Sequence, residues 1–157
     1  MLYVHGGGWV FHDLETHDHF CRYLAREPGW ALLAVDYRRA PKHPWSAPLD
    51  DVETALRWLK ANGNGLDVDT AIVSAVGDSS GANLVAGLSV RDPKSPAMQL
   101  LMYPPVDLWS DTESMRTEST AALDAVGMVW SWDAYAGGAD NEGIAPLRPA
   151  SPWQECR

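Results

Sequence analysis

Cysteine is scarce in this sequence. Cys21 and Cys156 are the only two cysteines in 157 residues, and they stand far apart. Two isolated cysteines form neither the closely spaced framework of a disulfide-rich protein nor the spacing of a zinc site. We therefore expect reduced thiols and no metal site.

Basic residues and long apolar runs are lacking as well. Lys and Arg total 12 against 21 Asp and Glu, which gives a formal net charge of −9. This charge argues against nucleic acid and against anionic membrane surfaces as partners. No stretch approaches the roughly 18 apolar residues of a membrane-spanning helix, and no leader of the secretory type opens the chain. The cytoplasm is the favoured location unless a targeting segment lies outside this chain, and the oligomeric state stays open.

What the chain does contain is an alternation of strand-like and helix-like segments. We expect strands over residues 1–4, 30–35, 73–76 and 98–103. We expect helices over residues 16–26, from Pro48 to about Gly63, over 82–90 and over 125–135, with an irregular stretch over 106–120. At this length the chain forms about one domain. Strands that alternate with helices predict an α/β fold with a parallel sheet and right-handed crossovers.

The third strand runs into the motif G-x-S-x-G, formed by Gly77, Ser79 and Gly81. A strand before the motif and a helix after it are the context of a nucleophile elbow, a tight turn that presents a serine. The glycines let the flanking backbone segments pass close to one another. The N-terminus of the following helix offers free N–H groups to a developing oxyanion. The sequence therefore indicates Ser79 as a nucleophile.

The first strand runs into His5 and three glycines, Gly6 to Gly8, followed by Trp9. A plain flexible loop is one interpretation. The other is the H-G-G-G loop that supplies oxyanion-hole N–H groups in lipases and esterases. The two motifs support each other, because their joint occurrence by accident is less probable than that of either alone. We expect His5 to shape the loop rather than to act as a general base.

Several motifs in order resemble the hormone-sensitive-lipase-like branch of the α/β-hydrolases. They are His5 to Trp9, residues 36–44 (DYRRAPKHP), residues 49–51 (LDD), residues 77–84 (GDSSGANL), residues 103–107 (YPPVD) and residues 130–135 (WSWDAY). Arg39 and Lys42 depart from the family's usual leucine and glutamate.

The resemblance implies a carboxylesterase that acts on short acyl esters without a cofactor. It makes Ser79 the nucleophile and the backbone N–H groups of Gly7, Gly8 and Ser80 the oxyanion donors. The remaining motif positions would support this machinery: His5, Gly6, Trp9, Gly77, Asp78 and Gly81. It also implies the strand order second-first-third-fourth, helices on both faces, and Ser79 beside Gly6 to Gly8 at the carboxyl ends.

One departure from the family is large. The family's triad runs serine, then acid, then histidine along the chain. Here all histidines precede Ser79: His5, His12, His17, His19 and His43. We expect none of them to reach Ser79 with a carboxylate to orient it. The chain would then be a single partial hydrolase domain over residues 1–157 that lacks flanking strands at both ends. It would hold a cap-like segment over about 106–135 and an irregular tail over 136–157.

Such a chain would be at most weakly active alone, and two other functions stay open. One is a receptor-like, non-catalytic binder of small molecules on the same fold. The other is an interaction protein whose open sheet edges pair with a partner. On either view we expect partly exposed apolar side chains at the edge strands, namely Leu32, Leu33, Leu100, Leu101 and Met102.

Overall fold

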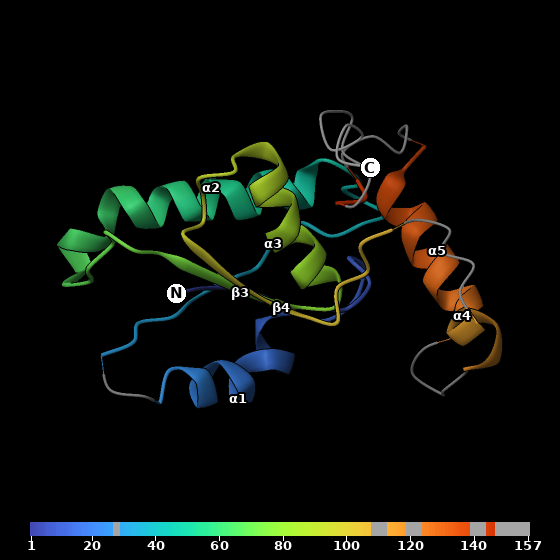
Figure 1. The fold of residues 1–157 in the computed structure, drawn as a ribbon, viewed down its shortest axis with the longest axis horizontal. Coiled ribbons are helices and arrows are strands. Elements are labelled where there is room, and N and C mark those ends of the chain that lie inside the picture. Colours follow the sequence, from blue (N-terminus) through green and yellow to red (C-terminus); the bar gives the residue numbers. More distant parts are fainter. Residues whose placement is uncertain (27–28, 108–112, 119–123, 139–143, 147–157) are drawn as a thin grey trace.

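A computed structural model describes residues 1–26, 29–107, 113–118, 124–138 and 144–146 (Figure 1). Its elements in chain order are β1 (Leu2–Val4), α1 (Leu14–Leu24), β2 (Leu33–Val35), α2 (Ala47–Asn62), the short 3₁₀ helix η1 (Gly63–Leu66), β3 (Ser74–Asp78), α3 (Ser80–Arg91), β4 (Met98–Met102), α4 (Glu113–Thr117) and α5 (Ala125–Ala136).

The strands form one parallel sheet in the order β2-β1-β3-β4, as the sequence predicts. In the register of β1, Leu2 pairs with Leu33 on one side and with Ala75 on the other. All of β1 is buried, as expected for a strand with neighbours on both sides and helices over its faces. Since all strands run the same way, their carboxyl ends meet at one edge.

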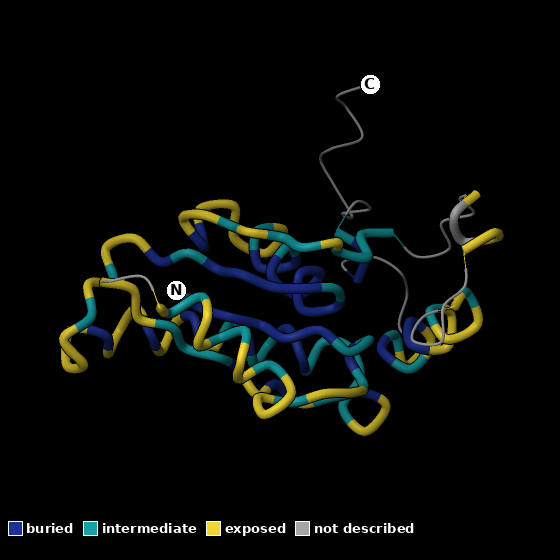
Figure 2. The backbone as a smooth tube through the Cα atoms, turned by 90° about the horizontal axis from the view of Figure 1, so that it is seen from below, coloured by how far each residue is buried: buried dark blue, intermediate teal, exposed yellow. Residues whose placement is uncertain are grey.

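Helices lie on both faces of the sheet. Figure 1 shows α2 and α3 over one face and α1 over the other. Apolar side chains of α2 and α3 form the main core with the sheet: Leu49, Val52, Leu56, Leu59, Leu84, Val85 and Leu88. No residue of α1 is fully buried. Figure 2 shows the buried strands between helices whose outer sides are exposed. The α3 face therefore carries most of the hydrophobic stabilisation.

Two local expectations are wrong. The second strand covers only Leu33–Val35, because β1, the neighbour to which it pairs, is itself only three residues long. The short helix α4 falls in the stretch expected to be irregular. Parts of the proposed cap-like segment (108–112 and 119–123) and most of the tail (139–143 and 147–157) lie outside the described residues.

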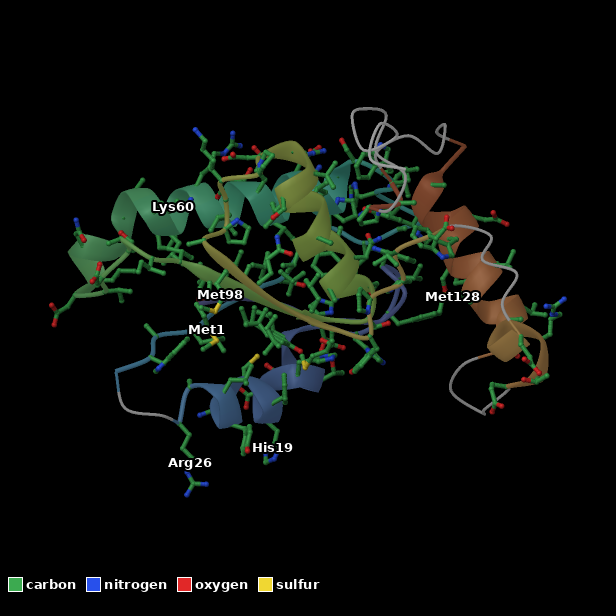
Figure 3. The ribbon with its side chains drawn as sticks, viewed as in Figure 1. Met1, His19, Arg26, Lys60, Met98 and Met128 are labelled. Atoms are coloured by element: carbon green, nitrogen blue, oxygen red, sulfur yellow. The ribbon has the colours of Figure 1, made fainter. Side chains whose placement is uncertain are left out.

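The apolar edges match the expectation. Leu32, Leu33, Leu101 and Met102 are partly buried, and Leu100 is exposed. The side chain of Gln99 donates to Ser89 on α3, so its strand neighbours Met98 and Leu100 point to the opposite face. Figure 3 places Met98 on that face, the one that α1 covers only in part. An edge strand with exposed apolar side chains promotes self-association.

We predict that Leu100→Lys lowers the concentration-dependent association of the chain, because a lysine on an edge strand opposes edge-to-edge pairing. Sedimentation velocity over a range of concentrations measures the effect. The matched control is Val126→Lys, which places the same charge on an exposed apolar position of α5. Equal effects of both variants would mean that net charge, not the β4 edge, controls association.

We also predict that Gly77→Ala destabilises the fold by about 1–3 kcal/mol, the usual cost of overpacking. A Cβ on Gly77 would lie 2.6 Å from the Gly81 backbone and 2.7 Å from the nitrogen of Ala82, and neither backbone atom can move aside. Gly65→Ala is the control, because its Cβ would meet nothing within 4 Å. Urea unfolding monitored by circular dichroism measures both, and a Gly77→Ala chain as stable as Gly65→Ala would contradict the prediction.

Candidate functional site: a serine turn beside a glycine loop

Two turns meet where β1 and β3 end. The glycine loop follows β1, and Ser79 follows β3. A Cβ built on Gly6 would lie 3.1 Å from the Cβ of Ser79 and 2.9 Å from the carbonyl oxygen of Asp78. Only glycine allows this approach. The expected juxtaposition of Ser79 with the glycine loop is confirmed.

Ser79 has a backbone conformation that residues other than glycine rarely adopt, with φ 50° and ψ −123°. Hydrogen bonds hold it on both sides: its N–H donates to the carbonyl of Met102 (2.9 Å), and its own carbonyl accepts from the N–H of Asn83 (3.1 Å). Strained conformations of this kind persist where the surrounding structure enforces them, and they concentrate at functional sites. The turn places the Ser79 side chain in the wall of a pocket.

The glycine loop is built around a tight turn. The carbonyl of Gly7 accepts from the N–H groups of Val10 (3.1 Å) and Phe11 (2.8 Å). Gly7 and Gly8 have φ of 126° and 58°, which suit glycine. The N–H of Gly6 donates to Asp78 (3.0 Å) and is therefore occupied. The N–H groups of Gly7 and Gly8 remain as candidate donors to a ligand.

Ser80 is the third candidate donor. It is the first residue of α3, so its N–H has no partner within the helix. It also lines the pocket together with Gly7 and Gly8. Donors from two chain segments therefore border one cavity beside Ser79.

The Asp78 carboxylate locks the two turns together. Its Oδ1 accepts from the Tyr3 hydroxyl (2.6 Å) and from the Gly6 N–H (3.0 Å). Burial and this hydrogen bond raise the pKa of Tyr3 well above its ordinary value. Asp78 thus joins β1, the glycine loop and the serine turn.

His5 has the geometry of a loop-shaping residue. Its ring is 1% exposed and stacks on Tyr37 with a centroid distance of 4.5 Å. Its Nδ1 lies 2.8 Å from the carbonyl oxygen of Gly6, so Nδ1 carries the proton in this contact. The Tyr37 hydroxyl donates to the His5 carbonyl (2.9 Å). Burial lowers the pKa of the His5 imidazole, which favours the neutral form.

Two histidines lie closer to the serine turn than the sequence indicated. His12 and His17 line the same pocket as Ser79. The Nε2 of His17 lies 3.6 Å from Oδ2 of Asp78. His19 is exposed, and Figure 3 shows it pointing from α1 away from the sheet. Helical spacing could have predicted the position of His17. His17 precedes Phe20 by three residues and so lies on the same side of the helix, and Phe20 packs on Tyr3 of the sheet.

The pocket has a volume of about 650 Å³ and draws its walls from four parts of the chain. They are the glycine loop and its continuation, α1, the serine turn, and the segments after β4 up to α5. Several of its lining residues were not predicted from the sequence to border a site: Phe11, Tyr103, Asp124, Met128 and Trp130.

Helix α5 reaches the glycine loop directly. A Cβ on Gly8 would lie 2.8 Å from the hydroxyl oxygen of Ser131. Trp9, the next residue, stacks on Tyr135 with a centroid distance of 4.5 Å and contacts Trp132. Trp9, Trp132 and Tyr135 are all buried, so a closed aromatic cluster docks α5 on the loop.

The described residues contain neither a metal-binding cluster nor a membrane-spanning helix. Within them, no group of three or more His, Cys, Asp or Glu side chains is arranged to hold a metal ion. In the same part of the chain, no helix is both long and apolar enough to cross a membrane.

We predict that His5 makes stability pH-dependent. Because its pKa is lowered in the folded state, its contribution is complete above the unfolded value of about 6.5 and is lost as the pH falls below it. The free energy of unfolding should therefore decline less from pH 7.5 to pH 5 in His5→Gln than in the parent chain. His19→Gln, an exposed histidine on α1, should keep the full decline. Urea titrations at each pH provide the measurement, and parallel declines in all three proteins would refute the assignment.

Comparison with known proteins gives a consistent result. The family described as the alpha/beta hydrolase fold matches residues 1–156. Esterase LipI of Mycobacterium tuberculosis is 35% identical, over 95% of this chain and 48% of LipI. The ethyl acetate hydrolase of Pseudomonas putida is 34% identical, over 87% of this chain and 45% of its own length. The crystal structure of esterase LipW from Mycobacterium marinum superposes with a TM-score of 0.86 at 33% identity, over 96% of this chain and 50% of that one.

This chain therefore spans about half the length of the curated relatives it matches. Its four-stranded parallel sheet, its two motif turns and the match over residues 1–156 agree with one another. The chain belongs to the hormone-sensitive-lipase-like family of α/β-hydrolases.

Proposed function

We propose that this chain carries the nucleophile and the oxyanion hole of a carboxylic-ester hydrolase that works through an acyl-enzyme on Ser79. One observation carries the proposal: the strained Ser79 turn stands at the start of α3, directly beside Gly6 to Gly8. The relatives that are named as esterases and hydrolases support the reaction class.

The steps follow from this arrangement. The Ser79 oxygen attacks the ester carbonyl, and its proton passes to a base. The carbonyl oxygen becomes an oxyanion, which the N–H groups of Gly7, Gly8 and Ser80 stabilise. Collapse of the tetrahedral intermediate breaks the bond to the alcohol, which leaves with the proton from the base. Water then cleaves the acyl-enzyme in the same manner and releases the acid.

Among the described histidines, His17 is the candidate base. Serine at its ordinary acidity is a weak nucleophile and needs an adjacent base. His17 shares the pocket with Ser79, and Asp78 lies beside its Nε2. The Nε2 of His17 lies 3.6 Å from Oδ2 of Asp78, beyond hydrogen-bond distance, so Asp78 orients His17 only weakly. We therefore expect slow turnover by the chain alone.

A stoichiometric reagent tests the nucleophile even when turnover is slow. We predict that diethyl p-nitrophenyl phosphate, whose phosphorus is attacked by an activated serine with release of p-nitrophenol, modifies Ser79. Intact-mass and peptide-mapping mass spectrometry locate the adduct. Ser79→Ala should abolish it, whereas Ser89→Ala, a serine further along α3, should keep it. An adduct at another residue, or one that survives in Ser79→Ala, would refute the proposal.

The same assay tests the base. His17→Gln should slow the labelling of Ser79 by about 100-fold, the lower range for a general base. His19→Gln, two residues away on the exposed side of α1, should label at the parent rate. Equal rates in both variants would exclude His17.

A receptor-like binder is the second candidate, because all five histidines of this chain precede Ser79, against the order of the family's triad. A non-catalytic binder gives no Ser79 adduct while it still binds small neutral ligands in the pocket. The labelling experiment therefore separates the two functions.

A further inference from the structure

Three exposed aromatic rings border the pocket, and we call them the aromatic mouth: Phe11, Tyr103 and Trp130. Their exposed fractions are 55%, 73% and 48%. Phe11 follows the glycine loop, Tyr103 follows β4, and Trp130 belongs to α5. Rings from three separate parts of the chain therefore converge on the opening of one cavity.

These rings are not needed to hold α5 in place. The closed cluster of Trp9, Trp132 and Tyr135 already docks the helix, and its members are at most 4% exposed. Trp130 stands two residues before Trp132, on a different side of α5, and contacts Phe11 with a centroid distance of 5.9 Å and planes inclined by 26°. Large aromatic side chains left half exposed beside a cavity are typical of binding surfaces.

The charged side chains that line the pocket restrict the charge of a ligand that these rings can bind. Its described lining residues include the carboxylates of Asp78 and Asp124 and the imidazoles of His12 and His17, but no Lys or Arg. Asp78 is buried, where a negative charge acts over a lower dielectric than in water. A negative charge on the ligand ring, away from the N–H groups of Gly7, Gly8 and Ser80, would therefore be disfavoured.

We propose that the aromatic mouth selects esters that carry an uncharged aromatic ring, which it binds by ring-to-ring contact with Phe11 and Trp130. This inference rests on the proposed function, in that it names the class of ester that Ser79 receives. The ligand ring does not enter between Phe11 and Trp130, because stacked contacts of about 3.5 Å on each side would need a wider gap. It lies against the faces that the two rings leave open, while the carbonyl oxygen points to the glycine loop.

A pair of matched amides tests the proposal without any need for turnover. Acetanilide and N-cyclohexylacetamide share the acetamide group and the ring size, and only the first ring is aromatic. We expect acetanilide to bind the chain about five-fold more tightly, the scale of one to two aromatic contacts. Ligand-observed NMR titrations give both dissociation constants. Equal affinities, or no measurable binding of acetanilide, would overturn the proposal.

Variants assign the preference to the rings. Phe11→Leu and Trp130→Leu keep apolar bulk but remove the ring, so each should reduce the preference to about two-fold or less. Trp58→Leu is the matched control, because Trp58 is similarly exposed on α2 and does not line the pocket. An unchanged midpoint of urea unfolding in each variant verifies that the fold is intact. A preference that survives in both ring variants, or that is lost in Trp58→Leu, contradicts the assignment.

A charged analogue and the Ser79→Ala chain complete the test. 4-Acetamidobenzoate, which adds a carboxylate to the ring of acetanilide, should bind about ten-fold more weakly than acetanilide because of the carboxylates at the site. Equal binding would refute the charge argument. Ser79→Ala should keep the preference for acetanilide. Failure of Ser79 labelling with an intact preference would therefore sink the proposed function alone, and labelling without any preference would sink only the aromatic mouth.

Discussion

The buried carboxylate of Asp78 is the contact on which the site depends. Its Oδ1 holds the Tyr3 hydroxyl and the Gly6 N–H at once, and Oδ2 faces His17. These groups come from β1, from the loop that follows it and from α1. A charged acceptor gives stronger hydrogen bonds than a neutral one, and a buried carboxylate must have such partners. One side chain thereby fixes the position of the glycine loop relative to the serine turn.

The three N–H groups of the glycine loop therefore have different roles. The N–H of Gly6 donates to Asp78, and the N–H groups of Gly7 and Gly8 remain as candidate donors at the pocket. His5 fixes the loop from the other side through its ring nitrogen and its carbonyl. The loop is therefore held by its first residues and open at its last ones. An oxyanion hole requires this combination, because donors stabilise a transition state only if they need no reorganisation.

Much of the fold could be predicted from the sequence, and the reasons are physical. The strand order follows from the crossover rule and the family's order, and the meeting of Ser79 with Gly6 follows from parallel strands that end at one edge. Strand lengths could not be predicted, because β2 begins at Leu33, opposite the first residue of its neighbour β1, rather than at the start of its apolar run. The residues that line the pocket were harder to predict from the sequence. Trp130 and Phe11 lie far apart in sequence and meet only through the docking of α5. The position of His17 on the sheet-facing side of α1 could have been predicted from helical spacing, but it was not.

The contact between Gly8 and Ser131 has an evolutionary consequence. Position 8 has no room for a Cβ because the Ser131 side chain occupies that space, and a residue larger than serine at 131 would press on the backbone of the glycine loop. The two positions, more than a hundred residues apart in the chain, therefore behave as one mutational unit. Substitutions that reshape helix α5 are free on its outer side and constrained at this point. An increase in side-chain size at Ser131 is thus more restricted than one at an exposed position of α5 such as Val126.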